Sequence, residues 1–524
     1  MTRNPLHDDA GPDTRWTITN TAENFPDVAT PLGWSFWERP LERALRGAFC
    51  DLGALRPSEV RFPPSVDDRC SGVFFGRFTA NLTTLLRFAD RMPGTSGAAF
   101  EEQMFGGSSW EGRAVWQRYP VVAVKMPATA LLLPRRLRSL RTGIDRWWRT
   151  VTAPGALDDP ARARAVLREA MAHFERVMRP HTVCTMLGQV CYEQVDRLAE
   201  AAGMPGAQIS LVTGDGVEET SLSDELWRLS RGGGSLERFL ARHGYHGPSE
   251  ADVASLSWRE DPKPVQRLVE SYRSMPDETS PAAAMRAQRG RRDTAERELL
   301  ARLPAPRRFV ARRVLALTRT FLPLRETGKA AFVQSIDGGR AACRALGTVL
   351  AAEGVLAAAD DVRYLTVDEL LGGVGPEVRE RVEERRAAYR EYRGYRLPDR
   401  WTGAPVAIAA EEPHGDDGSP ITGMPVSSGR VEGVARVVSD PHRDELEVDE
   451  ILVCETTDPS WASFFLVASA VVIDIGGPIS HGAIIAREMG IPCVINTRNG
   501  SRRIRSGQRV RVDGDAGTVE ILEA

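Results

Sequence analysis

The sequence has few of the residues that cross-link a chain or anchor it in a membrane. Its seven cysteines are scattered over 524 residues without a Cys-x-x-Cys pair, which argues against a disulfide framework and predicts a reducing, cytoplasmic setting. The longest apolar stretches, near residues 121–133 and 464–475, are too short or too interrupted to span a bilayer. The polar N-terminal residues lack the apolar core of a signal peptide.

Other absences limit the ligands that the chain can bind. The net charge is −3 with both signs interspersed, so neither nucleic acid nor an anionic membrane is expected as a partner. No GxxxxGK[ST] or GxGxxG loop is present to hold a nucleotide. His173 and His181 have no matching set of ligands around them, so no metal site is expected.

The most informative stretch covers residues 470–496. Its apolar start predicts a buried strand that ends at the loop beginning Gly476-Gly477. Ser480 then stands where a helix N-cap belongs, and His481 follows in the first turn of the predicted helix. A short apolar run after this helix predicts a second strand. The pattern therefore places one histidine at a helix N-terminus, directly after a glycine loop.

This position has a chemical consequence. The first N–H groups of a helix have no partner inside the helix, and the helix dipole is positive there, so phosphate is favoured. The same field favours the neutral imidazole, which is a nucleophile toward phosphorus. We therefore predict that His481 becomes phosphorylated and that Gly477 and Ser480 bind the phosphoryl group. From these residues alone, the alternative is an exposed polar residue in a first turn.

Two longer segments carry a family resemblance. GGPISHGAIIAREMGIPCV (residues 476–494) and CETTDPSW (residues 454–461) resemble the swivelling phosphohistidine domain of the phosphoenolpyruvate-utilising enzymes. That family includes phosphoenolpyruvate synthase, pyruvate phosphate dikinase and rifampin phosphotransferase. The resemblance implies that His481 carries a phosphoryl group between two distant sites.

The part of the chain before this domain resembles the drug-binding domain of the rifampin phosphotransferases, beginning with NFPDVATPLGWSFW (residues 24–37). In that family an ATP-grasp domain precedes this point, and here we expect none. The expected organisation is a multidomain chain. It comprises a disordered tail (1–13), a mostly α-helical acceptor-binding domain of α+β class (14–401), a Pro/Gly/Asp-rich linker (402–423) and a small α/β swivelling domain (424–524).

One internal motif departs from the family pattern. RHGYHGPSEADVASLSWREDP (residues 242–262) resembles a signature that reads GHRG, then Glu and Asp, then a W-x-E-D-P tail. Tyr245 and His246 replace the family's His and Arg, which indicates a different acceptor. We predict that His246 and Glu250 bind the substrate. The alternative for His246 is a structural loop histidine.

A second internal motif pairs two cations. Arg325 and Lys329 are four residues apart and share a face if a helix has begun. Lys329 is one of only three lysines among 68 basic residues, and an ammonium differs from a guanidinium in shape and hydration. With the resemblance added, we predict that both residues are catalytic and neutralise a transferring phosphoryl group. The alternative is an exposed pair with Glu326 as a partner.

Three functions remain open. The first is a phosphotransferase in which a separate ATP-grasp protein loads His481 from ATP and Mg²⁺, no cofactor being bound by this chain alone. The phosphoryl group then passes to a small-molecule hydroxyl, which dehydration could follow because phosphate is a good leaving group. The second is a non-catalytic binding or regulatory homologue. The third is a phosphocarrier that depends on phosphoenolpyruvate.

Overall fold

The computed structural model describes residues 4–523 apart from 20, 22–24, 26–27, 94–95, 106–108, 214–217, 274, 278–279, 410–418, 440–443, 445, 448, 458–460 and 478–479. For a few residues within helices and strands, His481 among them, it describes the backbone but not the side chain. Among the helices in these ranges, none is long and apolar enough to cross a bilayer.

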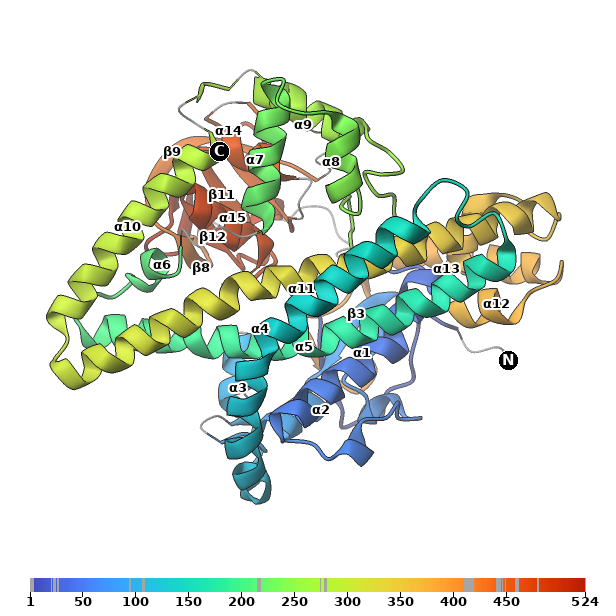
Figure 1. Ribbon diagram of the computed structural model, residues 1–524, viewed down its shortest axis with the longest axis horizontal. Helices are drawn as coiled ribbons and strands as arrows, with labels where there is room; N and C mark the ends of the chain where they lie inside the picture. Colours follow the sequence, from blue (N-terminus) through green and yellow to red (C-terminus); the bar gives the residue numbers. More distant parts are fainter. Residues whose placement is uncertain are drawn as a thin grey trace. The chain divides into compact units, whose positions relative to one another are not determined.

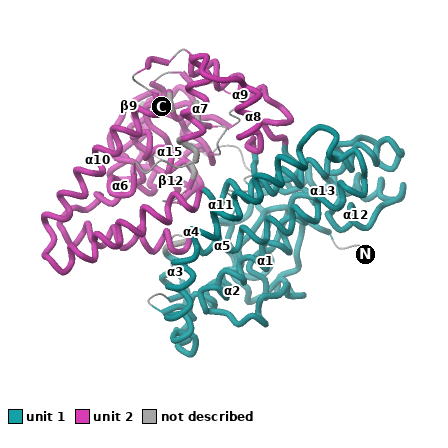
Figure 2. The backbone as a smooth tube through the Cα atoms, viewed as in Figure 1, with its two compact units in different colours: residues 1–184, 249–255, 327–410 teal, residues 185–248, 256–326, 411–524 magenta. Residues whose placement is uncertain are grey.

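The chain forms two compact units, coloured separately in Figure 2. Unit 1 comprises residues 1–184, 249–255 and 327–410, and unit 2 comprises residues 185–248, 256–326 and 411–524. Two long helices, α5 (Pro160–Ala201) and α11 (Ala305–Ala352), contribute residues to both units. The expected acceptor domain over 14–401 is thus divided between the units, because its middle clusters with the C-terminal strands. The predicted boundaries stay a prediction.

Unit 1 combines helices with a small antiparallel sheet (Figure 1). Its other helices are α1 (Pro31–Leu52), α2 (Leu82–Ala89), α3 (Gly97–Phe105), α4 (Tyr119–Val151), α12 (Val367–Gly372) and α13 (Val378–Arg393), with short 3₁₀ turns η1 (Pro57–Glu59), η2 (Val66–Asp68), η3 (Trp116–Arg118) and η5 (Ala359–Tyr364). The sheet has the order β2-β3-β1-β5 and consists of β1 (Arg15–Thr17), β2 (Ser71–Phe74), β3 (Arg77–Asn81) and β5 (Arg400–Thr402). A separate pair joins β4 (Tyr395–Arg396) to β6 (Ile408–Ala409).

The N-terminal segment differs from the expected disordered tail. Leu6 and Asp8 are buried, and Asp8 exchanges hydrogen bonds with Val73, its N–H donating to the Val73 carbonyl (2.8 Å) and its carboxylate accepting from the Val73 N–H (3.0 Å). The polar composition of this segment concealed these contacts, because the partners of Asn4, His7 and Asp8 lie far along the chain.

Unit 2 surrounds an eight-stranded sheet with helices (Figure 1). The strand order is β7-β14-β13-β9-β10-β11-β12-β8. The strands are β7 (Ile421–Thr422), β8 (Met424–Ser427), β9 (Arg430–Val437), β10 (Ile451–Cys454), β11 (Ala470–Ile473), β12 (Cys493–Ile495), β13 (Arg509–Asp513) and β14 (Thr518–Glu523). The helices are α6 (Gln208–Leu211), α7 (Glu218–Ser230), α8 (Leu236–His243), α9 (Lys263–Arg273), α10 (Pro281–Arg302), α14 (Ala462–Val467), α15 (His481–Met489) and α16 (Gly500–Arg503).

The middle of this sheet is parallel, with β9, β10, β11 and β12 adjacent. Alternate residues of each strand enter different cores, as a pleated strand requires. Leu452 and Val471 pack with α14 and α15, whereas Val453 and Val472 pack with β13 and β14 on the other face. Burial on both faces explains the continuous apolar runs of the sequence.

The predicted linker over 402–423 is only partly described. Residues 410–418 lie outside the described residues, whereas β6 and β7 fall inside the predicted range. Strands β13 and β14 pair antiparallel as a hairpin near the end of the chain.

Candidate functional site

The N-terminus of α15 has the geometry that the sequence predicted. Ser480 is the N-cap, with extended backbone angles and a side chain that accepts a hydrogen bond from the Ala483 N–H at 3.4 Å. The Ser480 N–H donates to the Gly477 carbonyl at 2.9 Å, which ties the glycine loop to the helix start. His481 is the first residue of α15, and its side chain lies outside the described residues. The N–H groups at a helix N-terminus and the helix dipole favour an anion there.

Gly482, the second residue of α15, allows the helix to approach the sheet closely. A Cβ there would lie 2.4 Å from the Ile473 Cδ1 and 2.8 Å from the Thr457 Oγ1. Thr457 is buried and comes from the CETTDPSW segment. That segment therefore contacts the start of the helix that carries His481.

Asp474 anchors the beginning of the glycine loop. It directly follows β11 and accepts hydrogen bonds from the Thr497 Oγ1 (2.6 Å) and from the N–H and hydroxyl of Ser501. Burial raises the pKa of the Asp474 carboxyl, and the hydrogen bonds from Ser501 and Thr497 oppose that rise. Because its oxygens accept hydrogen bonds from Thr497, which follows β12, and from Ser501 of α16, Asp474 has a positional role.

The buried side of α15 carries an arginine, Arg487. Arg487 is 4% exposed, donates from Nε to the Ala483 carbonyl at 3.0 Å, and lies 5.9 Å from the centre of the Tyr192 ring. Burial lowers the pKa of Arg487, and the positive charge of Arg325 lowers it further. The charge of Arg325 therefore acts on Arg487 of α15.

The end of α15 packs against α10. Gly490 caps the helix in the left-handed conformation, with φ of 71°. A Cβ at this position would lie 2.5 Å from the Gln288 Nε2 and 2.9 Å from an Arg291 guanidinium nitrogen. Glycine is therefore required both by backbone conformation and by the close approach of α10.

In unit 1, the structure brings together two of the predicted site residues. The Lys329 Nζ lies 3.9 Å from the Glu250 Oε2, although the two residues are far apart in sequence. The Glu250 side chain is 7% exposed and that of Lys329 is 20% exposed. This arrangement places an ammonium and a carboxylate together at a largely enclosed position.

Arg325 lies one turn before Lys329 on α11, as predicted, but contacts a different carboxylate. Its guanidinium forms an ion pair with the buried Glu326 at 2.8 Å. Glu326 is the partner that the alternative interpretation of this cation pair named. The two cations thus share a helix, and each lies beside a buried carboxylate.

His246 lies in a cluster of rings within unit 2. Its ring centre is 4.2 Å from that of Tyr245, 5.5 Å from that of Trp258 and 6.3 Å from that of His243. The pKa of His243 is lowered to about 4 by burial and, to a smaller extent, by nearby His246, and Glu225 opposes the change. His246 is itself buried, a setting that fits the structural alternative as well as the predicted substrate contact.

Two residues of this region were missed at the level of sequence. Thr457 stood in a quoted segment without being singled out, and Arg487 stood inside the predicted helix. A mostly apolar helix face interrupted by an arginine was the available signal for Arg487. Within the described ranges, no three His, Cys, Asp or Glu residues converge as a metal site.

Residues 446–517 match the family described as PEP-utilising enzyme, mobile domain. The predicted resemblance is confirmed. Residues 192–326 match the rifampicin phosphotransferase fourth domain. Helix α15 belongs to the mobile domain, and α10, Tyr192 and Arg325 belong to the fourth-domain match. The packing of α15 on α10 in unit 2 is therefore a contact between these two matched segments.

Several curated proteins are similar to more than half of this chain. The rifampicin phosphotransferase of Streptomyces sviceus is 35% identical over 325 residues, which cover 59% of this chain and 37% of that protein. The Bacillus subtilis protein of the same name is 29% identical over 321 residues, covering 58% and 37%. Chondramide synthase of Chondromyces crocatus is 30% identical over 332 residues, covering 56% and 8%. The matched region thus spans well under half the length of these relatives.

Proposed function

We propose that His481 accepts a phosphoryl group derived from ATP and passes it to a hydroxyl group of a small molecule. The observation that carries this proposal is the match of residues 446–517 to the mobile domain, with His481 at the capped start of α15. The free N–H groups of that first turn stabilise the charge on a phosphoryl group bound to the imidazole.

The transfer needs two bond exchanges. A neutral imidazole nitrogen of His481 attacks phosphorus, forming a P–N bond as the bond to the donor breaks. In the second step the acceptor oxygen attacks the same phosphorus, the P–N bond breaks, and the hydroxyl proton goes to the imidazole nitrogen. The histidine returns to its starting state, and the acceptor becomes a phosphate ester.

Lys329 and Arg325 supply positive charge for the second step. A phosphoryl group in transfer spreads negative charge over its oxygens, and fixed cations stabilise that charge. Arg325 is close enough to α15 to influence Arg487, and Lys329 is paired with the carboxylate of Glu250. Glu250 orients the ammonium and binds the acceptor, with His246 as a second substrate-binding residue.

The phosphoryl donor is ATP held with Mg²⁺ by a separate ATP-grasp protein. The sequence contains no glycine-rich nucleotide loop, and the described residues hold no metal-binding cluster. The family resemblance implies that ATP yields AMP and phosphate. Mg²⁺ would neutralise the phosphates on the partner, and the residues of this chain would receive and deliver the phosphoryl group.

The acceptor is a small molecule with a reactive hydroxyl. Relatives are named for rifampicin, and the change to Tyr245 and His246 in the 242–262 motif favours an acceptor of different shape. A phosphorylated hydroxyl is a better leaving group, so elimination of phosphate, and net dehydration, can follow transfer.

A donor panel tests the proposal. The protein is incubated with Mg·ATP and a separately expressed ATP-grasp domain of a rifampicin phosphotransferase, or with phosphoenolpyruvate, and rifampicin is added as the first acceptor probe. We expect AMP and phosphate from ATP only, and an acid-labile phosphate on the protein. Labelling by phosphoenolpyruvate alone would favour the phosphocarrier, and no labelling by either donor would favour the binding homologue.

A further inference from the structure

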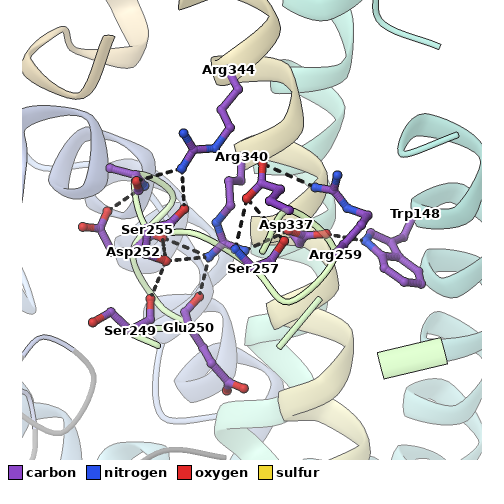
Figure 3. Close-up of polar contacts among 12 residues, drawn as sticks. Trp148, Ser249, Glu250, Asp252, Ser255, Ser257, Arg259, Asp337, Arg340 and Arg344 are labelled. Carbon is purple, nitrogen blue, oxygen red and sulfur yellow. Dashed lines mark hydrogen bonds and ion pairs between the residues drawn. The ribbon is translucent and has the colours of Figure 1, made fainter. Parts of the chain in front are cut away.

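The loop from Ser249 to Ser255 in unit 1 is held by arginines of α11 (Figure 3). Arg340 is 1% exposed, and one of its terminal nitrogens donates to the Asp252 carbonyl at 3.0 Å, the Ser255 hydroxyl at 3.1 Å and the Glu250 carbonyl at 3.4 Å. A planar guanidinium can satisfy several acceptors at fixed angles, which a lysine cannot do. The loop is therefore fixed through its backbone.

Arg340 is itself held in place from two helices. Its other terminal nitrogen donates to the Asp337 Oδ1 at 2.8 Å, one turn earlier on α11. The second oxygen of Asp337 accepts from the Trp148 indole of α4, also at 2.8 Å. All three side chains are almost completely buried. A buried charge pair with such bonds has little freedom to move, so it can define the position of what it binds.

The loop from Ser249 to Ser255 also contacts Lys329. Residues 329 and 340 are eleven apart, which is close to three full helical turns, so both lie on the same side of α11 about 16 Å apart. The Glu250 carbonyl accepts a hydrogen bond from Arg340, whereas the Glu250 Oε2 lies 3.9 Å from the Lys329 Nζ. One residue of the loop thus connects the two cations of this face.

We propose that Arg340 is a positioning residue that presents the Glu250 carboxylate to Lys329. The proposal deepens the proposed function, on which it rests for the meaning of the Glu250–Lys329 pair. Arg340 binds the carbonyls of Glu250 and Asp252 and the hydroxyl of Ser255, so in this proposal it acts through Glu250. Because the loop is fixed before any acceptor binds, the pair is prepared in advance.

Selective amine labelling tests this proposal without any phosphoryl transfer. The chain has only three lysines, Lys125, Lys263 and Lys329, so mass spectrometry resolves the acetylation rate of each in one protein. A carboxylate beside an ammonium stabilises its protonated, unreactive form. We expect Arg340→Met to raise the Lys329 rate about two- to fivefold, the scale of one partly exposed ion pair, with Lys125 and Lys263 unchanged.

Three further variants make the result decisive. Glu250→Gln should raise the Lys329 rate to the same extent, because it removes the carboxylate directly. Arg344→Met is the matched control, since Arg344 donates to the carbonyls of Ala254 and Ser255 at the far end of the loop; it should leave the Lys329 rate unchanged. Arg340→Lys keeps a charge beside Asp337 and serves if Arg340→Met does not fold.

An unchanged Lys329 rate in the Arg340 variants, with a raised rate in Glu250→Gln, would overturn the proposal. So would equal effects of Arg340→Met and Arg344→Met, which would indicate general loosening of the loop. If phosphoryl transfer fails in the wild-type protein while labelling behaves as expected, the positioning role stands and the proposed function falls.

Discussion

Lys329 and Arg325 lie on one helix but pair with different carboxylates, Glu250 and Glu326. If both cations stabilise the phosphoryl group in transfer, replacing either with Met should slow transfer about 10²- to 10³-fold, as for loss of one preorganised donor. Loading of His481 should be retained. Rapid-quench measurement of acceptor phosphate and of labelled protein separates the two steps.

Lys263→Met, on α9, is the matched control and should change neither step. Equal loss of loading and transfer in the Lys329 variant would contradict a role confined to transfer. The choice of Lys329 followed from its rarity in the sequence. Arg340 could not be chosen in the same way, because it is one of many arginines and its burial follows from contacts with a loop far away in sequence.

His243 makes stability depend on pH. Its pKa is lowered to about 4 by burial, against 6.5 for an exposed histidine. The unfolded chain therefore binds the proton first, so stability is lost as the pH falls from about 6.5 to about 4, by on the order of 3 kcal/mol. Urea unfolding across this range should show the loss in the wild type.

His243→Phe keeps a ring beside Phe239 and should remove most of that pH dependence. Glu225 remains paired with Arg242 at 2.7 Å in this variant. An equally steep loss of stability in His243→Phe would assign the pH dependence to other groups.

Ser480 is both the N-cap of α15 and the neighbour of His481 in the candidate site. Ser480→Ala removes the acceptor for the Ala483 N–H and should destabilise the protein by about 1 kcal/mol. It should also slow loading of His481, because the first turn that binds the phosphoryl group loses its cap. Thermal unfolding and the rate of acid-labile labelling measure the two effects.

Ser235→Ala is the matched control, since Ser235 caps α8 with a bond from the Arg238 N–H at 3.2 Å. It should cost similar stability and leave loading unchanged. Equal slowing by both variants would mean that Ser480 acts only on stability.

Sequence patterns were reliable for elements whose signals are local. The strand–glycine loop–helix–strand order from β11 to β12 was predicted because apolar runs, the N-cap and Gly490 all lie within it. The ordered segment around Asp8 was not predicted, because its acceptors and donors belong to β2.

The two compact units show what a linear division of the chain could not predict. The sequence suggested one acceptor domain followed by one carrier domain, whereas residues 185–248 and 256–326 cluster with the mobile domain. Helices α5 and α11 are each long enough to contribute to both units. Neither helix contains a sequence signal at residue 184 or 326, because the helical pattern continues through both points.

The chain's lack of a glycine-rich nucleotide loop leads to a prediction about its activity in isolation. A histidine at a helix end can receive a phosphoryl group, but ATP must be aligned by a backbone cradle and metal-holding carboxylates. The purified chain should therefore neither hydrolyse ATP nor bind it in calorimetry with Mg²⁺ present. Adding the separate ATP-grasp protein should produce AMP. Magnesium-dependent hydrolysis by the purified chain alone would contradict this division of labour.

If His481 carries the phosphoryl group, single-turnover labelling should detect it on that residue. Wild-type protein and His481→Ala are mixed with Mg·ATP labelled at both the β and γ phosphates and with the separate ATP-grasp protein, then quenched in alkali. We expect an acid-labile label on the peptide that contains His481 and none on the variant. Equal labelling of His481→Ala, or a label that survives acid, would contradict it.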